Sequence, residues 1–300
     1  KSVVNAILHC KGSIEVTKVL NKPPINQSHE AYEQEDANTQ CKKAAKYYTG
    51  EGVSQDYQEA AKWFHKAAEQ GHANAQYLLG VIYHEGDGVY QDTQEAIKWY
   101  HKAAEQGVAL SQFKLAEMYE KGDGFTQDYQ EAAEWYRKAA EQGDSDAQCI
   151  LGIMYNYGNG VSQDYQEASK WYSKAAEQGD ADAQYNLGKM YEEGYGVPQD
   201  YQEAVKWFRK AAVQGNADAQ CFLGAMYYNA NGVHQNYQEA EKWFRKADEQ
   251  ENAVAQFYLG LMYKRGYGVS PDYQEAEKWL RKAAEQGFPP AQTSLNELQS

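Results

Sequence analysis

The sequence predicts an all-α protein in which helix-turn-helix repeats of 36 residues stack on one another. The prediction rests on two residue series and on the apolar periodicity inside each repeat. All seven tryptophans are spaced 36 residues apart, at Trp63, Trp99, Trp135, Trp171, Trp207, Trp243 and Trp279. A glutamine series has the same spacing, at Gln40, Gln76, Gln112, Gln148, Gln184, Gln220, Gln256 and Gln292. A fixed period of this length is typical of a solenoid, since one unit cannot bury its apolar face alone.

The two series divide the chain into three parts. Residues 37–288 hold seven repeats, and residues 289–300 begin an eighth that is expected to act as a C-terminal cap. Residues 1–36 do not repeat. They are too few for an independent core, so we expect an N-terminal cap or a leader.

Each repeat is expected to contain two helices. In the second repeat the first helix is predicted over Ala73–Glu85, where apolar residues keep the rhythm of one helix face, and Gly86 ends it in a left-handed conformation. The second helix follows the recurring hexapeptide QDYQEA or a close variant. In the first repeat its buried face is predicted to be Ala60, Trp63, Phe64, Ala67 and Ala68.

The hexapeptide pairs two carboxylates, Asp56 and Glu59, which could be a catalytic acid and base or a helix signal. Seven equivalent copies offer no single special environment for catalysis. A capping box explains them better: the Asp accepts backbone N–H groups, and the Glu reaches back to the cap residue. Both charges also lie at the positive end of the helix dipole.

Small residues and exceptions to the pattern carry further expectations. A small residue recurs in the first helix and should let the next helix approach, under the tryptophan; the series is Gly80, Ala116, Gly152, Gly188, Gly224 and Gly260. Ala230 and Glu251 replace helix-ending glycines, so the sixth repeat is expected to end its helices differently. Truncating Trp279, near the end of the array, is expected to cost less stability than truncating Trp171.

The repeat pattern is similar to the Sel1-like repeat. The fifth repeat carries it clearly, from Ala181-Asp182-Ala183-Gln184 through Met190-Tyr191 and Gly194 to Lys210-Ala211-Ala212 and Gly215. The resemblance covers residues 37–300. It implies a right-handed α-solenoid related to tetratricopeptide arrays, and a role in scaffolding or adaptor binding.

Composition narrows the function classes. The net charge of −14 and the lack of a basic stripe argue against nucleic-acid binding. No run of 18 apolar residues predicts a membrane span, so a soluble monomer is expected. Without a phosphate-cradling glycine loop or a C-x-x-C pair, neither a cofactor nor a metal is expected. The source is expected to be bacterial. Its compartment stays open, because the family resemblance favours export whereas the cysteines favour the cytoplasm.

The cysteines do not form the pairs that staple each repeat in some exported relatives. Cys149 and Cys221 share one repeat position and lie two repeats apart, about 20 Å. A disulfide needs Cα atoms within about 7 Å, so these two are expected to be unpaired, buried thiols. A pair between Cys10 and Cys41 remains an alternative.

Two clusters suggest chemistry but have plainer interpretations. Ser111 and Lys114 spell S-x-x-K, the nucleophile motif of penicillin-recognising enzymes, but no K-T-G or S-D-N partner appears. His84, Glu85 and Asp87 resemble a metal cluster, yet a solvated helix end is the favoured interpretation.

In a repeat array the constant residues hold the stack, so function is expected where repeats differ. We therefore predict a non-enzymatic scaffold that binds a partner protein or peptide in a concave groove lined by the first helices. The alternatives are a β-lactam-interacting enzyme and a consensus-like array without an evolved ligand. The candidate groove residues are Tyr77, Val81, His84, Phe113, Glu117, Tyr157, Tyr185, Lys189, Tyr228, Tyr258 and Lys264.

Overall fold

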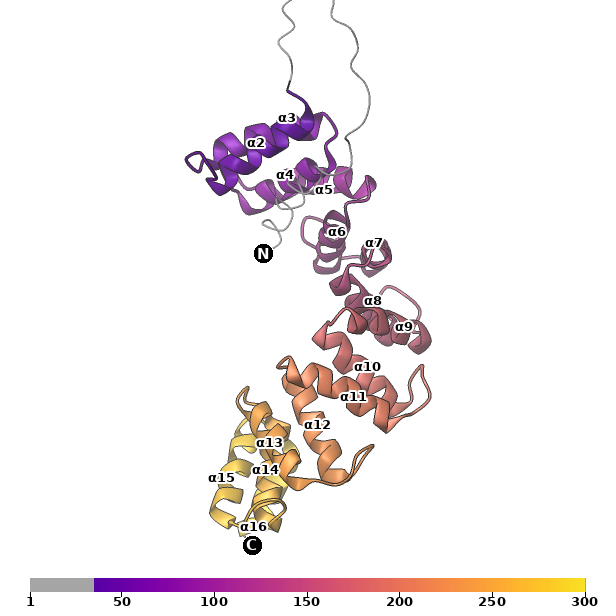
Figure 1. The fold of residues 1–300 in the computed structure, drawn as a ribbon, viewed down its shortest axis with the longest axis vertical. Coiled ribbons are helices and arrows are strands. Elements are labelled where there is room, and N and C mark those ends of the chain that lie inside the picture. The colour runs from indigo at the N-terminus through magenta and orange to yellow at the C-terminus, as the bar shows by residue number, and fades with distance from the viewer. Residues whose placement is uncertain (1–34, 300) are drawn as a thin grey trace, which may run out of the picture. The chain divides into compact units, whose positions relative to one another are not determined.

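The computed structural model describes residues 35–299, and all regular secondary structure in that range is α-helical (Figure 1). The chain divides after Gly143 into two compact units. The helices of the first unit are α2 (Ala37–Thr49), α3 (Tyr57–Glu69), α4 (Ala73–Glu85), α5 (Thr93–Glu105), α6 (Ala109–Lys121) and α7 (Tyr129–Glu141). Those of the second unit are α8 (Ser145–Tyr157), α9 (Tyr165–Glu177), α10 (Ala181–Glu193), α11 (Tyr201–Val213), α12 (Ala217–Asn229), α13 (Tyr237–Asp248), α14 (Ala253–Arg265), α15 (Tyr273–Glu285) and α16 (Pro289–Gln299).

Within each unit, consecutive helices pack on one another, so each repeat is a helical hairpin stacked on its neighbours. This confirms the predicted all-α class built from 36-residue helix-turn-helix repeats, and α4 has the predicted bounds. The predicted buried face of α3 is correct except for Trp63, which is half-buried. In the second unit, Trp207, Trp243 and Trp279 pack back onto the preceding repeat, as Trp207 does in a cluster with Ala168 and Ala175 of α9. In the described residues no repeat precedes Trp63.

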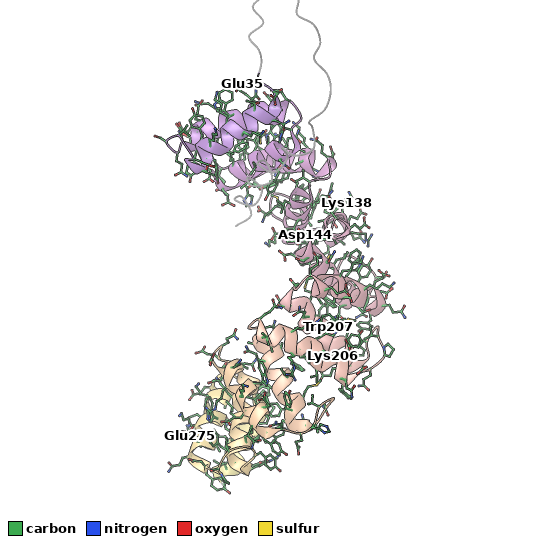
Figure 2. The ribbon with its side chains drawn as sticks, viewed as in Figure 1. Glu35, Lys138, Asp144, Lys206, Trp207 and Glu275 are labelled. Atoms are coloured by element: carbon green, nitrogen blue, oxygen red, sulfur yellow. The ribbon has the colours of Figure 1, made fainter. Side chains whose placement is uncertain are left out.

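On the second helix of a repeat, adjacent residues can point to opposite environments, one into the core and the next into solvent. Trp207 is buried on α11, whereas its neighbour Lys206 is exposed and pairs with Glu203 at 2.6 Å (Figure 2). This i, i+3 pair recurs along the second helices, as between Lys62 and Glu59.

The predicted cap is half right. Asp56 Oδ1 accepts the Glu59 N–H at 3.0 Å, as a helix cap should. Glu59 does not reach back to the cap residue, because the Asp56 N–H donates to the Tyr47 carbonyl at 2.9 Å. Its carboxylate instead accepts from Trp63 Nε1 and Lys62 Nζ, both at 3.0 Å. The preceding helix thus supplies the partner expected from the glutamate.

The small residue of the first helix lies under the residue after the tryptophan, which corrects the prediction. A Cβ added at Gly188 would lie 2.8 Å from the Phe208 ring, and one at Gly152 would lie 2.6 Å from the Tyr172 ring. Glycine there lets a flat ring rest on the helix backbone.

The sixth repeat ends its second helix differently, as predicted, but by one residue only: α13 stops at Asp248, whereas α11 extends one position further, to Val213. Ala230 and Glu251 keep positive φ angles of 63° and 59°, so the chain turns there as it does at the glycines of other repeats. The surrounding hydrogen bonds are retained: the Glu251 N–H still donates to the Asp248 carbonyl at 2.8 Å. Packing therefore overrides the local preference, at the cost of backbone strain.

Buried glutamines link neighbouring helices and explain the glutamine series. Gln106 Nε2 donates to Gln76 Oε1 at 2.6 Å, and Gln76 Nε2 donates to the Ala68 carbonyl of the preceding repeat at 3.1 Å. The second unit repeats this link, with Gln214 donating to Gln184 at 2.8 Å. Each buried amide is thereby paired, as burial requires.

Among residues 35–299, no helix combines the length and apolar character needed to cross a lipid bilayer.

Candidate binding site

Three predicted groove residues belong to the core rather than to a surface. Tyr77, Val81 and Tyr228 are buried. Tyr77 packs against Tyr100 with ring centroids 5.9 Å apart, and Tyr228 packs against Tyr258 at 5.4 Å. Their side chains fill the space between packed helices, so they present almost no surface to a partner.

Two further predicted aromatic residues, Phe113 and Tyr258, are half-buried between packed helices. Phe113 lies 5.4 Å from the Tyr136 ring, and Tyr258 stacks on Phe244 at 4.8 Å. These rings contribute part of their area to the core and only an edge to the surface.

The charged candidates are bound to other parts of the chain. Glu117 pairs with Lys114 at 2.6 Å and with Lys121 at 3.3 Å. Lys264 pairs with Glu297 of α16 at 3.3 Å. They stay accessible, but a partner would have to compete with these pairs.

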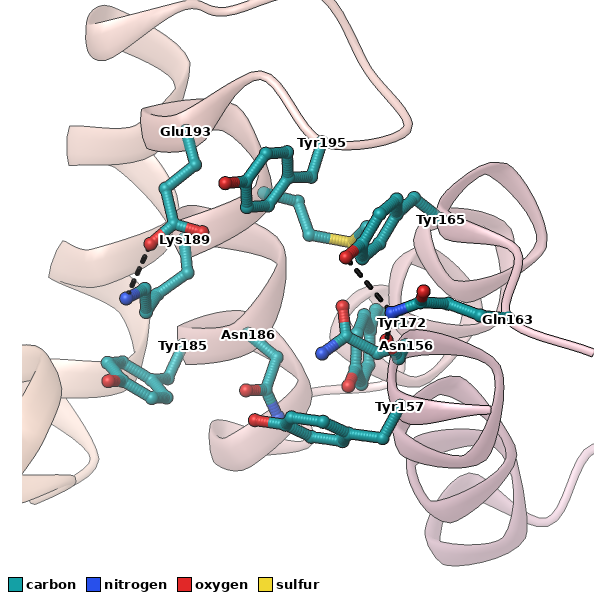
Figure 3. Close-up of a pocket in the computed structure, with 11 residues that line it drawn as sticks. Asn156, Tyr157, Gln163, Tyr165, Tyr172, Tyr185, Asn186, Lys189, Glu193 and Tyr195 are labelled. Carbon is teal, nitrogen blue, oxygen red and sulfur yellow. Dashed lines mark hydrogen bonds and ion pairs between the residues drawn. The ribbon is translucent and has the colours of Figure 1, made fainter. Parts of the chain in front are cut away.

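Three further candidates, Tyr157, Tyr185 and Lys189, come together at a cavity of about 380 Å³ in the second unit (Figure 3). We call this site the tyrosine notch. Its lining residues are Asn156, Tyr157, Gln163, Tyr165, Tyr172, Tyr185, Asn186, Lys189, Met190, Glu193 and Tyr195.

The notch has a buried floor and an exposed aromatic rim. Tyr172 and Met190 are buried, whereas the Tyr157 and Tyr195 side chains are 68% and 48% exposed. The Tyr195 ring stacks on Tyr165 with centroids 5.0 Å apart and an 18° interplanar angle. The rim therefore offers wide ring faces to a ligand, on residues that lose little freedom when they bind.

Hydrogen bonds and one ion pair hold the polar groups of the notch. Gln163 Nε2 donates to Tyr165 Oη at 3.0 Å and to the Asn156 carbonyl at 2.8 Å. Lys189 Nζ lies 2.7 Å from Glu193 Oε1. Figure 3 shows these groups around the opening.

Burial keeps the tyrosine hydroxyls of the notch neutral. It raises the pKa of Tyr172 and of Tyr185, so both stay protonated at neutral pH and can donate or accept hydrogen bonds. This chemistry suits binding and holds no activated nucleophile.

Sequence reasoning missed Tyr165, Tyr195 and Glu193. Tyr165 belongs to the recurring hexapeptide and was assigned to the repeat framework. Tyr195 lies between two loop glycines, outside the first helices that were predicted to line the groove. The signal was available, because other repeats place Asp87, Asp123 or Tyr267 at that loop position.

The same repeat positions form a smaller site in the first unit. A cavity of about 100 Å³ is lined there by charged groups that include His84, Glu117, Lys121 and Asp123. His84 Nε2 lies 3.2 Å from Asp123 Oδ2, which closes the opening with polar contacts. Changes at variable positions thus convert a charged, narrow site into an aromatic, wide one.

The sequence clusters that suggested other chemistry do not assemble. Asp87 accepts the Tyr48 hydroxyl at 2.6 Å rather than joining His84, and the described part of the chain contains no group of three metal-ligating side chains. Ser111 is fully buried, and Lys114 is bound to Glu117. The S-x-x-K serine is therefore not open to a substrate.

The thiols of the second unit are buried, as predicted. Cys149 and Cys221 are unbridged, and burial raises the pKa of Cys221 to about 12. Cys10 lies outside the described residues.

Comparison with known proteins finds a family match along most of the chain. The Sel1 repeat matches seven consecutive segments: 42–72, 73–108, 109–144, 145–180, 181–216, 217–252 and 253–288. A comparison with curated proteins finds no match.

Two solved structures resemble the chain over most of its length. One is a protective antigen present in uropathogenic Escherichia coli strains displaying an SLR fold, with 40% identity over 88% of this chain and a TM-score of 0.79. The chain spans 56% of that antigen. The other is a Sel1 repeat protein from Oxalobacter formigenes, with 37% identity, a TM-score of 0.66, and coverage of 87% of this chain and 76% of that one.

Proposed function

The chain belongs to the family of Sel1 repeat proteins, and from this premise we propose that it is a non-enzymatic scaffold. It binds a protein or peptide partner at the first-helix surface of its second unit, and it acts as a monomer. The tyrosine notch is the centre of that surface.

Proteins of this family generally act as scaffolds for protein interactions. The observation that carries the proposal for this chain is the composition of the tyrosine notch. In this chain the notch combines exposed Tyr157 and Tyr195 rings with amide and charged groups around a cavity. Tyrosine is enriched at the energetically dominant positions of protein interfaces, where a ring fills a pocket and the hydroxyl finds a partner.

A displayed library of random peptides tests the proposal. Peptides selected on the full chain should bind Tyr157→Ala and Tyr195→Ala at least tenfold more weakly than wild type, about 1.4 kcal/mol, because each change removes a rim ring. Tyr273→Ala is the matched control, since this equally exposed tyrosine lies outside the notch. Tyr185 is unsuitable for truncation, because it packs against Phe208 and Phe222.

The outcomes separate the alternatives. Selected peptides that bind the rim variants like wild type would move the interaction to another surface. A library that yields no binder would favour an array without an evolved ligand. A penicillin adduct on Ser111, found by mass spectrometry of the native chain, would favour the β-lactam-interacting enzyme; its burial leads us to expect no adduct.

A further inference from the structure

The second unit contains a copy of the tyrosine notch that already holds an arginine. Tyr237 and Tyr267 stand 72 residues after Tyr165 and Tyr195, and they stack in the same way, with centroids 4.6 Å apart and a 16° interplanar angle. The Arg265 guanidinium lies 5.9 Å from the Tyr267 ring centroid, and its Nη1 lies 3.4 Å from the Tyr228 hydroxyl. The repeat therefore builds a cation-binding tyrosine pair and fills it from its own chain.

In the tyrosine notch the repeat position of Arg265 is occupied by Glu193. The charge at that position is reversed, and Asn156 replaces the bulkier Tyr228. The stacked pair Tyr165–Tyr195 thus keeps its geometry without an arginine from its own helix, and the cavity lies beside it.

Glu193 is placed to receive a cation. Its side chain is 37% exposed, and Lys189 Nζ approaches it at Oε1, 2.7 Å away. Lys189 also lies 5.0 Å from the Phe222 ring centroid, on the side of the carboxylate away from Tyr165. In Figure 3 the second oxygen points away from Lys189, and the Tyr195 ring lies nearby.

We propose that the tyrosine notch binds an arginine side chain of the partner, with the guanidinium stacked on Tyr195 and hydrogen-bonded to Glu193. This inference rests on the proposed scaffold function and adds the chemistry of the partner. A planar guanidinium can stack on a ring and bond a carboxylate at once, whereas an ammonium is a compact point charge. The net charge of −14 also draws a basic segment toward the chain.

Blocked tripeptides with a central arginine, citrulline or lysine test the inference on the full chain. Citrulline keeps the shape of arginine and removes its charge. NMR titration with ¹³C-labelled tyrosine rings should show the arginine peptide shifting the Tyr165 and Tyr195 signals. Its Kd, on the order of 1 mM for so small a ligand, should be at least tenfold lower than that of the citrulline peptide.

Position 193 supplies the decisive variants. Glu193→Arg should abolish binding, because it places an intramolecular arginine where Arg265 stands in the related site, and that site shows how the fold accommodates it. Glu193→Gln should weaken binding at least fivefold by removing the charge alone. Glu177→Gln, an exposed carboxylate outside the notch, should bind like wild type. Circular dichroism checks that each variant is folded.

Three results would overturn the inference: equal affinity for the arginine and citrulline peptides, no tyrosine shift at 10-fold excess over the expected Kd, or unchanged binding by Glu193→Arg. The scaffold function fails separately. If library-selected peptides need Tyr157 and Tyr195 but contain no arginine, the scaffold stands and the arginine site falls. If the arginine tripeptide binds but the library yields no binder, the arginine site stands and the scaffold function falls.

Discussion

In the second unit, Trp207, Trp243 and Trp279 each pack backwards, onto the second helix of the preceding repeat. Trp243 joins a cluster with Ala204 and Ala211, and Trp279 joins one with Ala240 and Phe244. Trp279 is therefore as buried as Trp171, at 8% and 7% exposure, although it stands near the C-terminal end. The least buried tryptophan is Trp63, at the N-terminal end of the series, which is half-buried.

The stability lost when a tryptophan is truncated to alanine should follow the burial of its ring. Trp171→Ala and Trp279→Ala should each cost about 3–5 kcal/mol, because each removes a buried ring from a seam. Trp63→Ala should cost distinctly less, since Trp63 is half-buried and Lys43 covers its ring at 3.7 Å. Urea unfolding followed by circular dichroism measures all three. A loss at Trp63 as large as at Trp279 would contradict the backward packing.

Single residues were predicted from sequence with uneven success. Tyr157 and Lys189 line an open cavity, whereas Tyr77 and Tyr228, which occupy equally variable positions, are buried. A position can vary among repeats because it lies on a surface that binds a ligand, or because it lies in the core and packs against different rings. Whether a variable position is exposed or buried depends on the neighbouring helix, whose placement does not follow from the sequence spacing.

Helix ends are predicted well because their signals are local: a capping side chain precedes most of the helices, with Val108 before α6 as an exception, and a left-handed residue follows many of them. The first helix of the second repeat begins with an unusual cap, His72. Its Nδ1 accepts the Ala75 N–H at 3.1 Å, and its Nε2 lies 3.0 Å from Asn38 Oδ1. Asp144, Asp180 and Asn216 cap the equivalent helices of other repeats.

This cap should make the first unit sensitive to acid. Capping requires a neutral Nδ1, and burial lowers the pKa of His72 below its ordinary value, against an opposing effect of Asp36. A folded-state pKa below the unfolded value of about 6.5 gives stability that is present above pH 6.5 and lost as pH falls through the folded-state value. The melting temperature should therefore drop on going from pH 7.5 to pH 5.

The variant His72→Asn isolates that contribution. Asparagine caps the equivalent helix α12 through Asn216 Oδ1 without titrating, so the variant should lose less stability between the two pH values. His101 also titrates with a pKa lowered by burial, but it does so in both proteins and cancels in the comparison. An identical pH dependence in the variant and the wild type would rule out the cap as its cause.

At the scale of the whole molecule, each repeat within a unit contacts chiefly the repeats next to it along the stack. Helices pack on the next helix in the chain. The buried glutamines bond within their own repeat, as Gln214 does with Gln184, and to the repeat before it, as Gln184 does with the Ala176 carbonyl. Stability is then approximately a sum of repeat terms and nearest-neighbour terms.

Whole-repeat deletion tests this additivity. Removing residues 217–252 joins two equivalent repeat boundaries, so the shortened chain should stay helical and unfold cooperatively with a lower midpoint in urea. The tyrosine notch lies before the deletion and should keep its affinity for the arginine tripeptide. Removing residues 217–234 instead leaves a second helix without its partner, and the second unit should lose helical signal. Equal behaviour of the two deletions would contradict a repeat-by-repeat stack.

The last residue of each first helix reads Glu85, Lys121, Tyr157, Glu193, Asn229 and Arg265 from the second repeat to the seventh. All six positions end a helix with the same backbone, so natural selection can vary the side chain without touching the fold. A gene that gains one 36-residue unit also gains one such position. At Arg265 the chain keeps the neighbouring tyrosine pair for itself, whereas at Glu193 the pair is free for another molecule. Duplication of a repeat followed by one substitution would thus give an array a new partner specificity, and every intermediate sequence would still fold.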